Sequence, residues 1–490
     1  MKKLYILYCL LFFVICAVPG TMLLKKPDDG MDAITAEKRR LAEFPVFQDE
    51  EGNFNTKFST EFQAYVSDHF GFRQELVQLD SLLKADLLHV SAEDDVIIGK
   101  EDWFYYAKTT DDFIGNPTVS DLGLQNILRN LELMQEYTES KGSQLLVTIV
   151  PNKNTIYSEY MPDRYRNFGT SSNLDRLEQL LSGQEIQYLS LKDALLQEKE
   201  HSSMQLYHKL DSHWNNAGAL SGYRAIMDAS GLEYNSYPDA EKRYKIEWSR
   251  TGDIFEMLFP DSGILDENVV YLELDFNYRY LGHYKNSDDL MINTVNPEGT
   301  GSLLMFRDSF GEAIIPYFSQ SFNTAMYSRA RGCAFYYLEM QKYDLVIAEI
   351  VERNIAWLQR EAPMHGAIQV DPESVPESLA SFVPLTECYT DQNGSFLQIY
   401  GSVTLPGDVT TAPEYFVTLV NKDGEKISYK AYNCYESEKL GREKIQDNGY
   451  SLYISVADLQ EDMTYDAYLT VKLPDIVYRS ALGEITYPES

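Results

Sequence analysis

Cysteine is scarce in this chain, with only 5 among its 490 residues. Two of them, Cys9 and Cys16, lie in an apolar segment at the start. So few thiols exclude a disulfide framework of the kind that holds small secreted domains together. Cys388 and Cys434 lie in the same late region and could pair, leaving Cys333 free; two unpaired thiols fit the sequence equally well.

Basic residues are also in the minority. There are 42 Lys and Arg against 75 Asp and Glu, which gives a formal net charge of −33. This charge repels phosphate backbones and anionic lipid, so we expect no nucleic-acid partner. Repeats and low-complexity tracts are absent, and the length is sufficient for two or three domains with sizeable cores.

A long uncharged run is present near the amino end. Residues 4–24 lie between two lysine pairs, at positions 2–3 and 25–26. The run is long enough to span a bilayer as a helix, and the positive amino end favours a cytoplasmic start with the rest outside. A cleaved signal peptide is the rival interpretation, since Ala17 and Gly20 are small, but a clean small-x-small site is lacking. We therefore expect a membrane anchor in residues 1–26 and an exported protein in either case.

The remaining sequence divides by its periodicity. Residues 27–92 predict a helical arm, with apolar residues three and four apart, that packs on the next domain. Residues 93–368 alternate buried strands (144–150, 302–306, 324–327 and 345–350) with helices (216–229 and 312–322), which predicts a parallel α/β sheet covered on both faces. Within them, residues 232–299 are weakly periodic and predict an insertion over the carboxyl edge of the sheet. Residues 369–381 form a linker, and residues 382–490 show short alternating strands typical of an antiparallel β-sandwich.

Two segments of the α/β region carry residue types used in nucleophilic catalysis. Asp211-Ser212-His213-Trp214-Asn215 sets a carboxylate two residues before an imidazole, and Arg307-Asp308-Ser309 follows a buried strand. An aspartate, a histidine and a serine can together activate a hydroxyl, with backbone N–H groups receiving the developing oxyanion.

Simpler interpretations exist for each segment. Asp308 or Ser309 could be a helix cap, Asp211 and His213 could be a solvated loop pair, and Trp214 could be a core anchor. His208, Asp211 and His213 could also share a metal ion, although no fourth ligand of suitable type lies nearby. We expect neither a metal nor a cofactor.

The joint pattern resembles the SGNH hydrolase-like superfamily and, within it, the DHHW family related to the periplasmic proteins that O-acetylate alginate. The resemblance covers residues 38–362 and is carried by four motifs: Asp211-Ser212-His213-Trp214-Asn215-x-x-Gly218-Ala219, Arg307-Asp308-Ser309-Phe310, Val150-Pro151-Asn152-Lys153 and Asp68-His69-Phe70-x-x-Arg73. It implies an SGNH-like parallel sheet in which the Asp-His pair precedes the serine. It further implies that Ser309 is the nucleophile, His213 the general base and then acid, and Asp211 its orienting partner.

The sequence departs from the family pattern at three places. Ser212 replaces the first histidine of the D-H-H-W motif. Arg307 stands where glycine is usual, which implies either a wider serine turn or a guanidinium near the site. No clean Gly-x-Asn follows the strand at 345–350, so Asn354 and Arg353 are weaker candidates for the oxyanion hole than the backbone N–H of Ser309. We also name Arg329, Lys153 and Trp214 as candidates for holding substrate.

The resemblance implies a membrane-anchored, extracytoplasmic O-acetyltransferase that modifies a cell-surface or secreted polysaccharide. A multipass membrane acyltransferase would supply the acetyl groups. Two alternatives remain open: an esterase that removes acetyl groups with the same residues, and a non-catalytic protein that binds glycan through the insertion and the sandwich.

Overall fold

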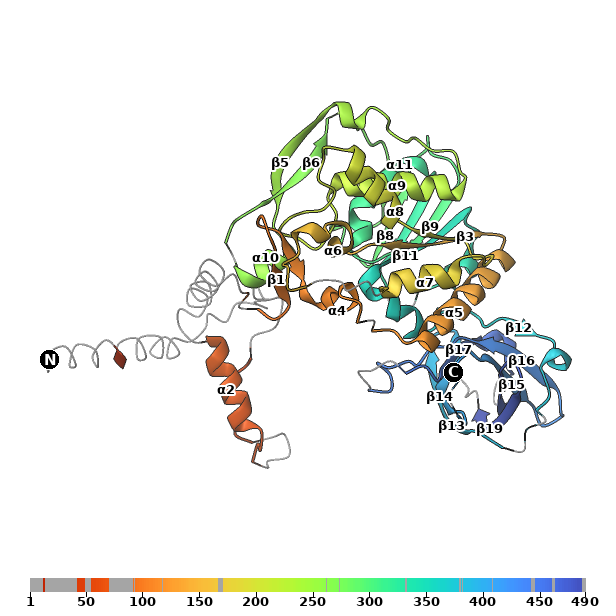
Figure 1. Cartoon of the computed structure of the whole chain (residues 1–490). Coiled ribbons are helices and arrows are strands. Elements are labelled where there is room, and N and C mark those ends of the chain that lie inside the picture. The colour runs from red at the N-terminus through yellow and green to blue at the C-terminus, as the bar shows by residue number, and fades with distance from the viewer. Residues whose placement is uncertain are drawn as a thin grey trace.

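The computed structural model describes residues 12–13, 42–48, 54–69, 91, 93–116, 118–165, 171–260, 262–272, 274–330, 333–378, 380, 382–407, 409–441, 446–460 and 463–486 (Figure 1). These residues form a central α/β unit, a unit of antiparallel sheets toward the carboxyl end and a separate helix near the amino end.

Only a few stretches of the amino-terminal part are described. Of the expected membrane segment only Phe12 and Phe13 are described, so that prediction lies outside the described residues; none of the helices that the structure does describe is both long and apolar enough to cross a bilayer. In the arm, α2 (Phe58–His69) has no buried residue, and its aromatic rings contact Phe44 and Phe47 of the arm itself. The described helix thus gives no support to the expected packing on the next domain, and residues 70–90 of the predicted arm lie outside the described residues.

A seven-stranded sheet forms the centre of the α/β unit, in the order β4-β3-β11-β9-β10-β8-β7. The first five strands pair in parallel, β8 runs antiparallel to them and β7 antiparallel to β8, so the prediction of a mostly parallel sheet is confirmed. The strands are β4 (Tyr188–Ser190), β3 (Gln144–Val150), β11 (Leu345–Val351), β9 (Ser302–Phe306), β10 (Thr324–Ser328), β8 (Met291–Val295) and β7 (Arg279–Leu281).

Helices cover both faces of this sheet because its central strands are apolar on both sides. Alternate residues of β9 divide between two cores: Leu303 and Met305 face one, Leu304 and Phe306 the other. The first core is completed by α8 (Lys192–His201), α9 (Asn216–Ser230) and α11 (Ile315–Ser321), and the second by α5 (Asp121–Ser140) and α7 (Asn173–Leu181). Figure 1 shows the two groups of helices on opposite sides of the sheet.

The predicted insertion at 232–299 is only partly an insertion. Its last two strands, β7 and β8, extend the central sheet. The rest forms a hairpin of β5 (Tyr244–Arg250) and β6 (Asp266–Tyr271), and the short helix α10 (Asp253–Leu258). Phe255 of α10 packs edge-on against Phe104, with ring centroids 5.1 Å apart, in the separate hairpin of β1 (Val96–Ile98) and β2 (Phe104–Tyr106).

Two antiparallel sheets follow, one of three strands and one of five. The predicted linker is wrong at one point, because β12 (Gln369–Val370) pairs with β16 (Lys426–Ala431) and so belongs to the larger sheet. The other strands are β13 (Leu385–Asn393), β14 (Phe396–Thr404), β15 (Glu414–Val420), β17 (Gly449–Ser455), β18 (Thr464–Lys472) and β19 (Val477–Thr486). Short elements complete the described chain: α4 (Thr110–Phe113), α6 (Lys153–Ile156), α12 (Tyr337–Met340), η2 (Ala107–Thr109), η3 (Ser158–Tyr160), η4 (Ala240–Lys242), η5 (Phe310–Ile314), η6 (Glu352–Gln359), η7 (Pro372–Ser374) and η8 (Val456–Asp458).

The carboxyl-terminal sheets share a buried polar contact with α5. Asn130 accepts a hydrogen bond from the backbone N–H of Asn433 (2.8 Å) and its amide group lies 3.3 Å from the Cys434 sulfur. Cys434 is fully buried there, and Cys333, Cys388 and Cys434 are all free thiols. The alternative of unpaired thiols therefore holds.

Gly218 determines how closely α9 approaches the loop that carries Asp211 and His213. A Cβ atom at this position would lie 2.4 Å from the carbonyl oxygen of Leu206 and 2.9 Å from Cβ of Trp214. Both neighbours are buried, so neither can move away freely.

We predict that Gly218→Ala destabilises the protein by about 1–3 kcal/mol through overpacking, although alanine normally favours a helix interior over glycine. Urea unfolding measures the change. The control is Ser221→Ala on the same helix, whose hydroxyl bonds only the carbonyl of Ala217 and whose loss we expect to stay within about 0.5 kcal/mol. A Gly218→Ala protein as stable as the wild type would contradict this account of the packing.

Candidate functional site

Ser309 lies at the carboxyl edge of the sheet, three residues beyond the end of β9. Asp308 shapes this turn: its Oδ1 accepts from the backbone N–H of Phe310 (2.8 Å) and its Oδ2 from that of Val351 (2.9 Å). The capping role thus falls to Asp308, and Ser309 makes no side-chain cap bond. The Ser309 hydroxyl is left available for another partner.

The helix expected at 312–322 differs in its first part. The chain after Ser309 forms the 3₁₀ helix η5 before the seven-residue α11 begins at Ile315. Asp308 accepts the N–H of Phe310, so that group is not available to an oxyanion at Ser309.

The Asp-His segment is a tight loop before α9. Tyr207 and Trp214 form a backbone bridge, and the N–H of His208 donates to the carbonyl of His213 (3.2 Å). Asn215 caps α9 by accepting from the backbone N–H of Ala217 (2.9 Å). The loop is thereby closed on itself between two regular elements.

Lys153 holds this loop through hydrogen bonds to its backbone. Its ammonium donates to the carbonyls of His208 (3.1 Å), Lys209 (3.0 Å) and Asp211 (2.7 Å). Burial lowers the pKa of Lys153 to about 8, against the opposing effect of nearby carboxylates. The side chain is buried and all three donors are used, so the structure corrects the expectation that Lys153 holds substrate.

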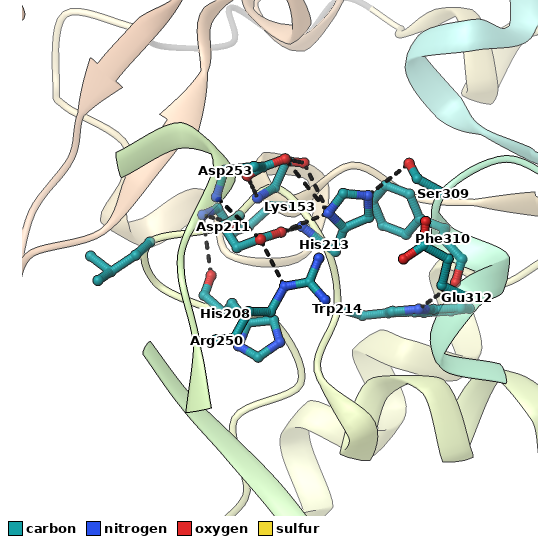
Figure 2. Close-up of polar contacts among 12 residues, drawn as sticks. Lys153, His208, Asp211, His213, Trp214, Arg250, Asp253, Ser309, Phe310 and Glu312 are labelled. Atoms are coloured by element: carbon teal, nitrogen blue, oxygen red, sulfur yellow. Dashed lines mark hydrogen bonds and ion pairs between the residues drawn. The ribbon is translucent and has the colours of Figure 1, made fainter. Parts of the chain in front are cut away.

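Figure 2 shows Asp211, His213 and Ser309 in one chain of contacts. His213 Nε2 lies 2.7 Å from Ser309 Oγ, and His213 Nδ1 lies 2.6 Å from Asp211 Oδ1. With the proton on Nδ1, the ring donates to Asp211 and its Nε2 accepts the serine hydroxyl. The Asp211 side chain is 1% exposed, so the interpretation as a solvated loop pair is wrong.

Two residues of the predicted insertion hold the second oxygen of Asp211. Arg250 Nε donates to Oδ2 (2.8 Å), and the backbone N–H of Asp253 donates to it at 3.2 Å. Burial acts to raise the pKa of Asp211, but His213 and Arg250 outweigh it and hold this pKa well below its usual range. The carboxylate therefore stays ionised.

Arg250 and Asp253 were not predicted from the sequence. The one signal was Gly252 between them, at the start of a short apolar helix. A Cβ atom there would lie 2.2 Å from the carbonyl oxygen of Leu210, so only glycine allows the insertion to approach the loop this closely.

Asp253 also holds Ser212, the residue that departs from the family motif. Its carboxylate accepts from the Ser212 backbone N–H (2.6 Å) and hydroxyl (2.7 Å), and its Oδ2 lies 3.6 Å from His213 Nδ1. Ser212 Oγ is 3.3 Å from the same ring nitrogen. A serine at this position thus links Asp253 to the ring.

The metal set proposed from sequence is not brought together. His208 turns its Nδ1 to the carbonyl of Glu267 (2.8 Å), and burial lowers its pKa to about 4. Asp211, His213 and Asp253 do have ligand atoms within 4.8 Å of one another. However, Arg250 already occupies Asp211 Oδ2, and its positive charge opposes a cation there.

The backbone N–H of Ser309 has no hydrogen-bond acceptor among the described residues. Arg353 lies with its guanidinium carbon 5.2 Å from the centre of the Phe310 ring, beside this turn. Asn354 is half-buried in η6, and its side chain is not hydrogen-bonded to Ser309, His213 or Asp211. Of the three predicted oxyanion donors, the backbone N–H of Ser309 is therefore the one that lies at the serine and has no acceptor among the described residues.

The other predicted substrate contacts are used within the protein. Arg307 is buried and donates to the carbonyls of Asp308 (3.2 Å), Asp289 (3.3 Å) and Ser287. Arg329 pairs with Asp288 (2.5 Å) and Glu312 (3.3 Å).

Trp214 joins the two halves of the site. The ring is buried, and its Nε1 donates to the carbonyl of Phe310 (2.9 Å), the residue after Ser309. It therefore serves as a core anchor, the simpler of the two interpretations of this residue.

Comparison with known proteins gives the same fold. Residues 96–261 match the family model described as the SGNH hydrolase-like domain of acetyltransferase AlgX; the match includes Asp211 and His213 and ends before Ser309. No curated protein shows significant similarity to the chain.

The solved structures that match this chain share little sequence with it. PatB1 of Bacillus cereus is 14% identical (TM-score 0.41; 53% of this chain, 96% of that chain). The O-acetyltransferase domain of Pseudomonas putida AlgJ is 15% identical (0.35; 53% and 92%). A DHHW family protein of Eubacterium siraeum is 14% identical (0.38; 49% and 90%).

These TM-scores lie below 0.5, so nothing about activity follows from the structural likenesses. The family model supports an enzyme of the acyltransferase or esterase type. The resemblance seen in the motifs is confirmed over residues 96–261, which match an SGNH hydrolase-like domain; the match does not extend to the rest of the chain.

Proposed function

We propose that the protein is an extracytoplasmic O-acetyltransferase that moves an acetyl group through Ser309 to hydroxyls of a cell-surface or secreted polysaccharide. The observation that carries the proposal is the continuous contact from Asp211 through His213 to the Ser309 hydroxyl, at 2.6 and 2.7 Å. Both spacings are those of hydrogen bonds, as a nucleophile and its base require.

In the first half of the reaction, His213 Nε2 takes the Ser309 proton as Oγ forms a bond to the carbonyl carbon of the acetyl donor. The negative charge that develops on the carbonyl oxygen is stabilised by the backbone N–H of Ser309. The intermediate collapses when the donor's leaving group departs with the proton from His213. The acetyl group is then an ester on Ser309.

In the second half, His213 takes the proton of a sugar hydroxyl, whose oxygen attacks the ester carbonyl. The bond to Ser309 Oγ breaks, and His213 returns the proton to the serine. Asp211 remains ionised throughout and stabilises the imidazolium that forms in each half. Its two bonds to Arg250 and Asp253 hold the carboxylate in place beside the ring.

The setting of the reaction is part of the proposal. An export segment at residues 4–24 would place the site outside the cytoplasm, where acetyl-CoA is absent. An anchor would hold it beside a multipass membrane acyltransferase that delivers acetyl groups. The free acceptor would then be the polysaccharide at the cell surface.

We predict that Ser309→Ala lowers acetyl transfer by on the order of 10⁴-fold or more, because the nucleophile is lost. Mass spectrometry of an oligosaccharide incubated with p-nitrophenyl acetate and the protein measures the transfer. The control is Ser302→Ala, at the opposite end of the same strand, where the hydroxyl bonds Asp344. Equal transfer by the Ser309→Ala and wild-type proteins would contradict an acyl-enzyme on Ser309 and favour the non-catalytic alternative.

Arg250 is a positioning residue in this account. We predict that Arg250→Met lowers kcat about tenfold with little change in KM, because Asp211 loses the charged partner of its Oδ2 atom. The effect stays moderate because Arg250 is itself partly exposed to water. Steady-state kinetics separates the two constants. Arg279→Met, on the edge strand β7, is the matched control and should leave both unchanged. A purely structural role for Arg250 would instead lower the melting temperature and leave kcat of the folded fraction intact.

Transfer and hydrolysis share the same residues, so the acceptor distinguishes them. We predict that adding oligosaccharide diverts acetyl from water to sugar, and that p-nitrophenol release then exceeds acetate release. The two products are measured in one reaction by absorbance and NMR. If acetate equals p-nitrophenol at every sugar concentration, the protein is an esterase.

A further inference from the structure

A glutamate lies within the central sheet, directly against the serine turn. Glu349 belongs to β11, which pairs in parallel with β3 on one side and with β9 on the other, and its side chain is buried. All the other residues of β11 are apolar, and the residue opposite Glu349 on β3 is Thr148. A carboxyl group in such a strand costs free energy unless it is hydrogen-bonded, so its presence indicates a specific role.

Glu349 holds the backbone of the residue before the nucleophile. Its Oε2 accepts the backbone N–H of Asp308 (2.9 Å). Asp308 in turn accepts the N–H groups of Phe310 and Val351 with its two oxygens. The two residues that flank Ser309 in the sequence therefore both have their N–H groups fixed by this pair of carboxyl groups.

The chain after the serine packs closely on the same glutamate. A Cβ atom at Gly311 would lie 3.2 Å from Glu349 Oε2 and 2.7 Å from Cβ of Arg307. Glycine thus lets η5 approach the carboxyl group with no room to spare. A displacement of the Glu349 side chain would be transmitted to the serine turn from both of its ends.

The contact between Glu349 and Asp308 requires a proton. Asp308 uses both oxygens as acceptors, as an ionised carboxylate does. Burial, the negative charge of Asp308 and a side-chain hydrogen bond to Asp308 raise the pKa of Glu349 well above its usual range, against the opposing effects of the Asp308 N–H and of Arg307. Asp308 and Arg307 are the charged groups that act on it most strongly. Glu349 is therefore the protonated member of the pair at neutral pH.

We propose that Glu349 is a positioning residue that, as a neutral acid, holds the serine turn in its reactive form, and that loss of its proton at alkaline pH displaces Ser309 from His213. The inference rests on the proposed role of Ser309 as the nucleophile. With its proton, Glu349 donates to the Asp308 carboxylate while it accepts the Asp308 N–H. Without the proton, two negative charges share one buried site, and the turn has to shift to separate them.

The pH dependence of Ser309 acetylation by p-nitrophenyl acetate tests the proposal, with the Ser309→Ala protein as the blank for spontaneous hydrolysis. We expect the wild-type rate to fall on the alkaline side. The Glu349→Gln protein should match the wild type at neutral pH and keep its rate at alkaline pH, because the amide makes the same two hydrogen bonds without a proton to lose. Lys153 also titrates on this side, so the difference between the two proteins is what counts. The same alkaline midpoint in both would overturn the proposal.

Two further variants separate this role from the mere presence of a buried acid. Glu349→Met removes both hydrogen bonds, and we expect it to slow acetylation roughly tenfold or more with little change in KM. Glu352→Gln is the matched control, since Glu352 is also a buried glutamate beyond the same strand but bonds Asn152 and Thr155 instead of the serine turn. It should leave the alkaline fall in place. Loss of that fall in the Glu352→Gln protein, or a wild-type rate in the Glu349→Met protein, would contradict the assignment.

Urea unfolding at a series of pH values tests the shared proton without catalysis. Because the pKa of Glu349 is raised on folding, its stabilising effect is complete below the pKa of an unfolded glutamate, about 4.3, and is lost as the pH rises through the folded pKa. We expect the wild type to lose stability relative to Glu349→Gln over this range. A difference that does not vary with pH would refute the shared proton. This measurement stands even if the protein transfers no acetyl group, so the two proposals fail separately.

Discussion

Asp211 carries its charge where water reaches 1% of its side chain, and the whole site is built to keep that charge paired. A buried carboxylate without partners would neutralise itself or destabilise the fold. Here His213 and Arg250 supply the opposing charges, and backbone N–H groups of His213 and Asp253 complete the set. These groups come from the loop before α9 and from the insertion. The hydrogen bonds and ion pairs that satisfy the Asp211 carboxylate therefore also fix the position of the imidazole against Ser309.

That constraint is supported by residues that never face a substrate. Lys153 holds three carbonyls of the loop, Trp214 ties the loop to the serine turn, and Asp308 holds the turn to β11. The arrangement explains why a strand end, a loop and a distant hairpin meet at one edge of the sheet. A site on rigid supports of this kind needs little rearrangement to reach its reactive geometry.

The sequence predicted the central strands and the grouping of Asp211, His213 and Ser309, because buried parallel strands and local motifs leave clear patterns. It did not predict Arg250 and Asp253, since their approach depends on the β5–β6 hairpin and on the space that Gly252 leaves. Lys153 was misread because a cation at a strand end looks the same whether it faces solvent or lies under a loop.

Acetylation of Ser309 itself is the central claim, and peptide mass spectrometry measures it most directly. The protein is mixed briefly with p-nitrophenyl acetate in the absence of sugar, quenched in acid and digested. The account predicts a mass gain of one acetyl group on the peptide that contains Ser309, lost when a sugar acceptor is added before quenching. Acetyl transfer to sugar with no acetyl on Ser309 at any time, or with acetyl on a different residue, would contradict it.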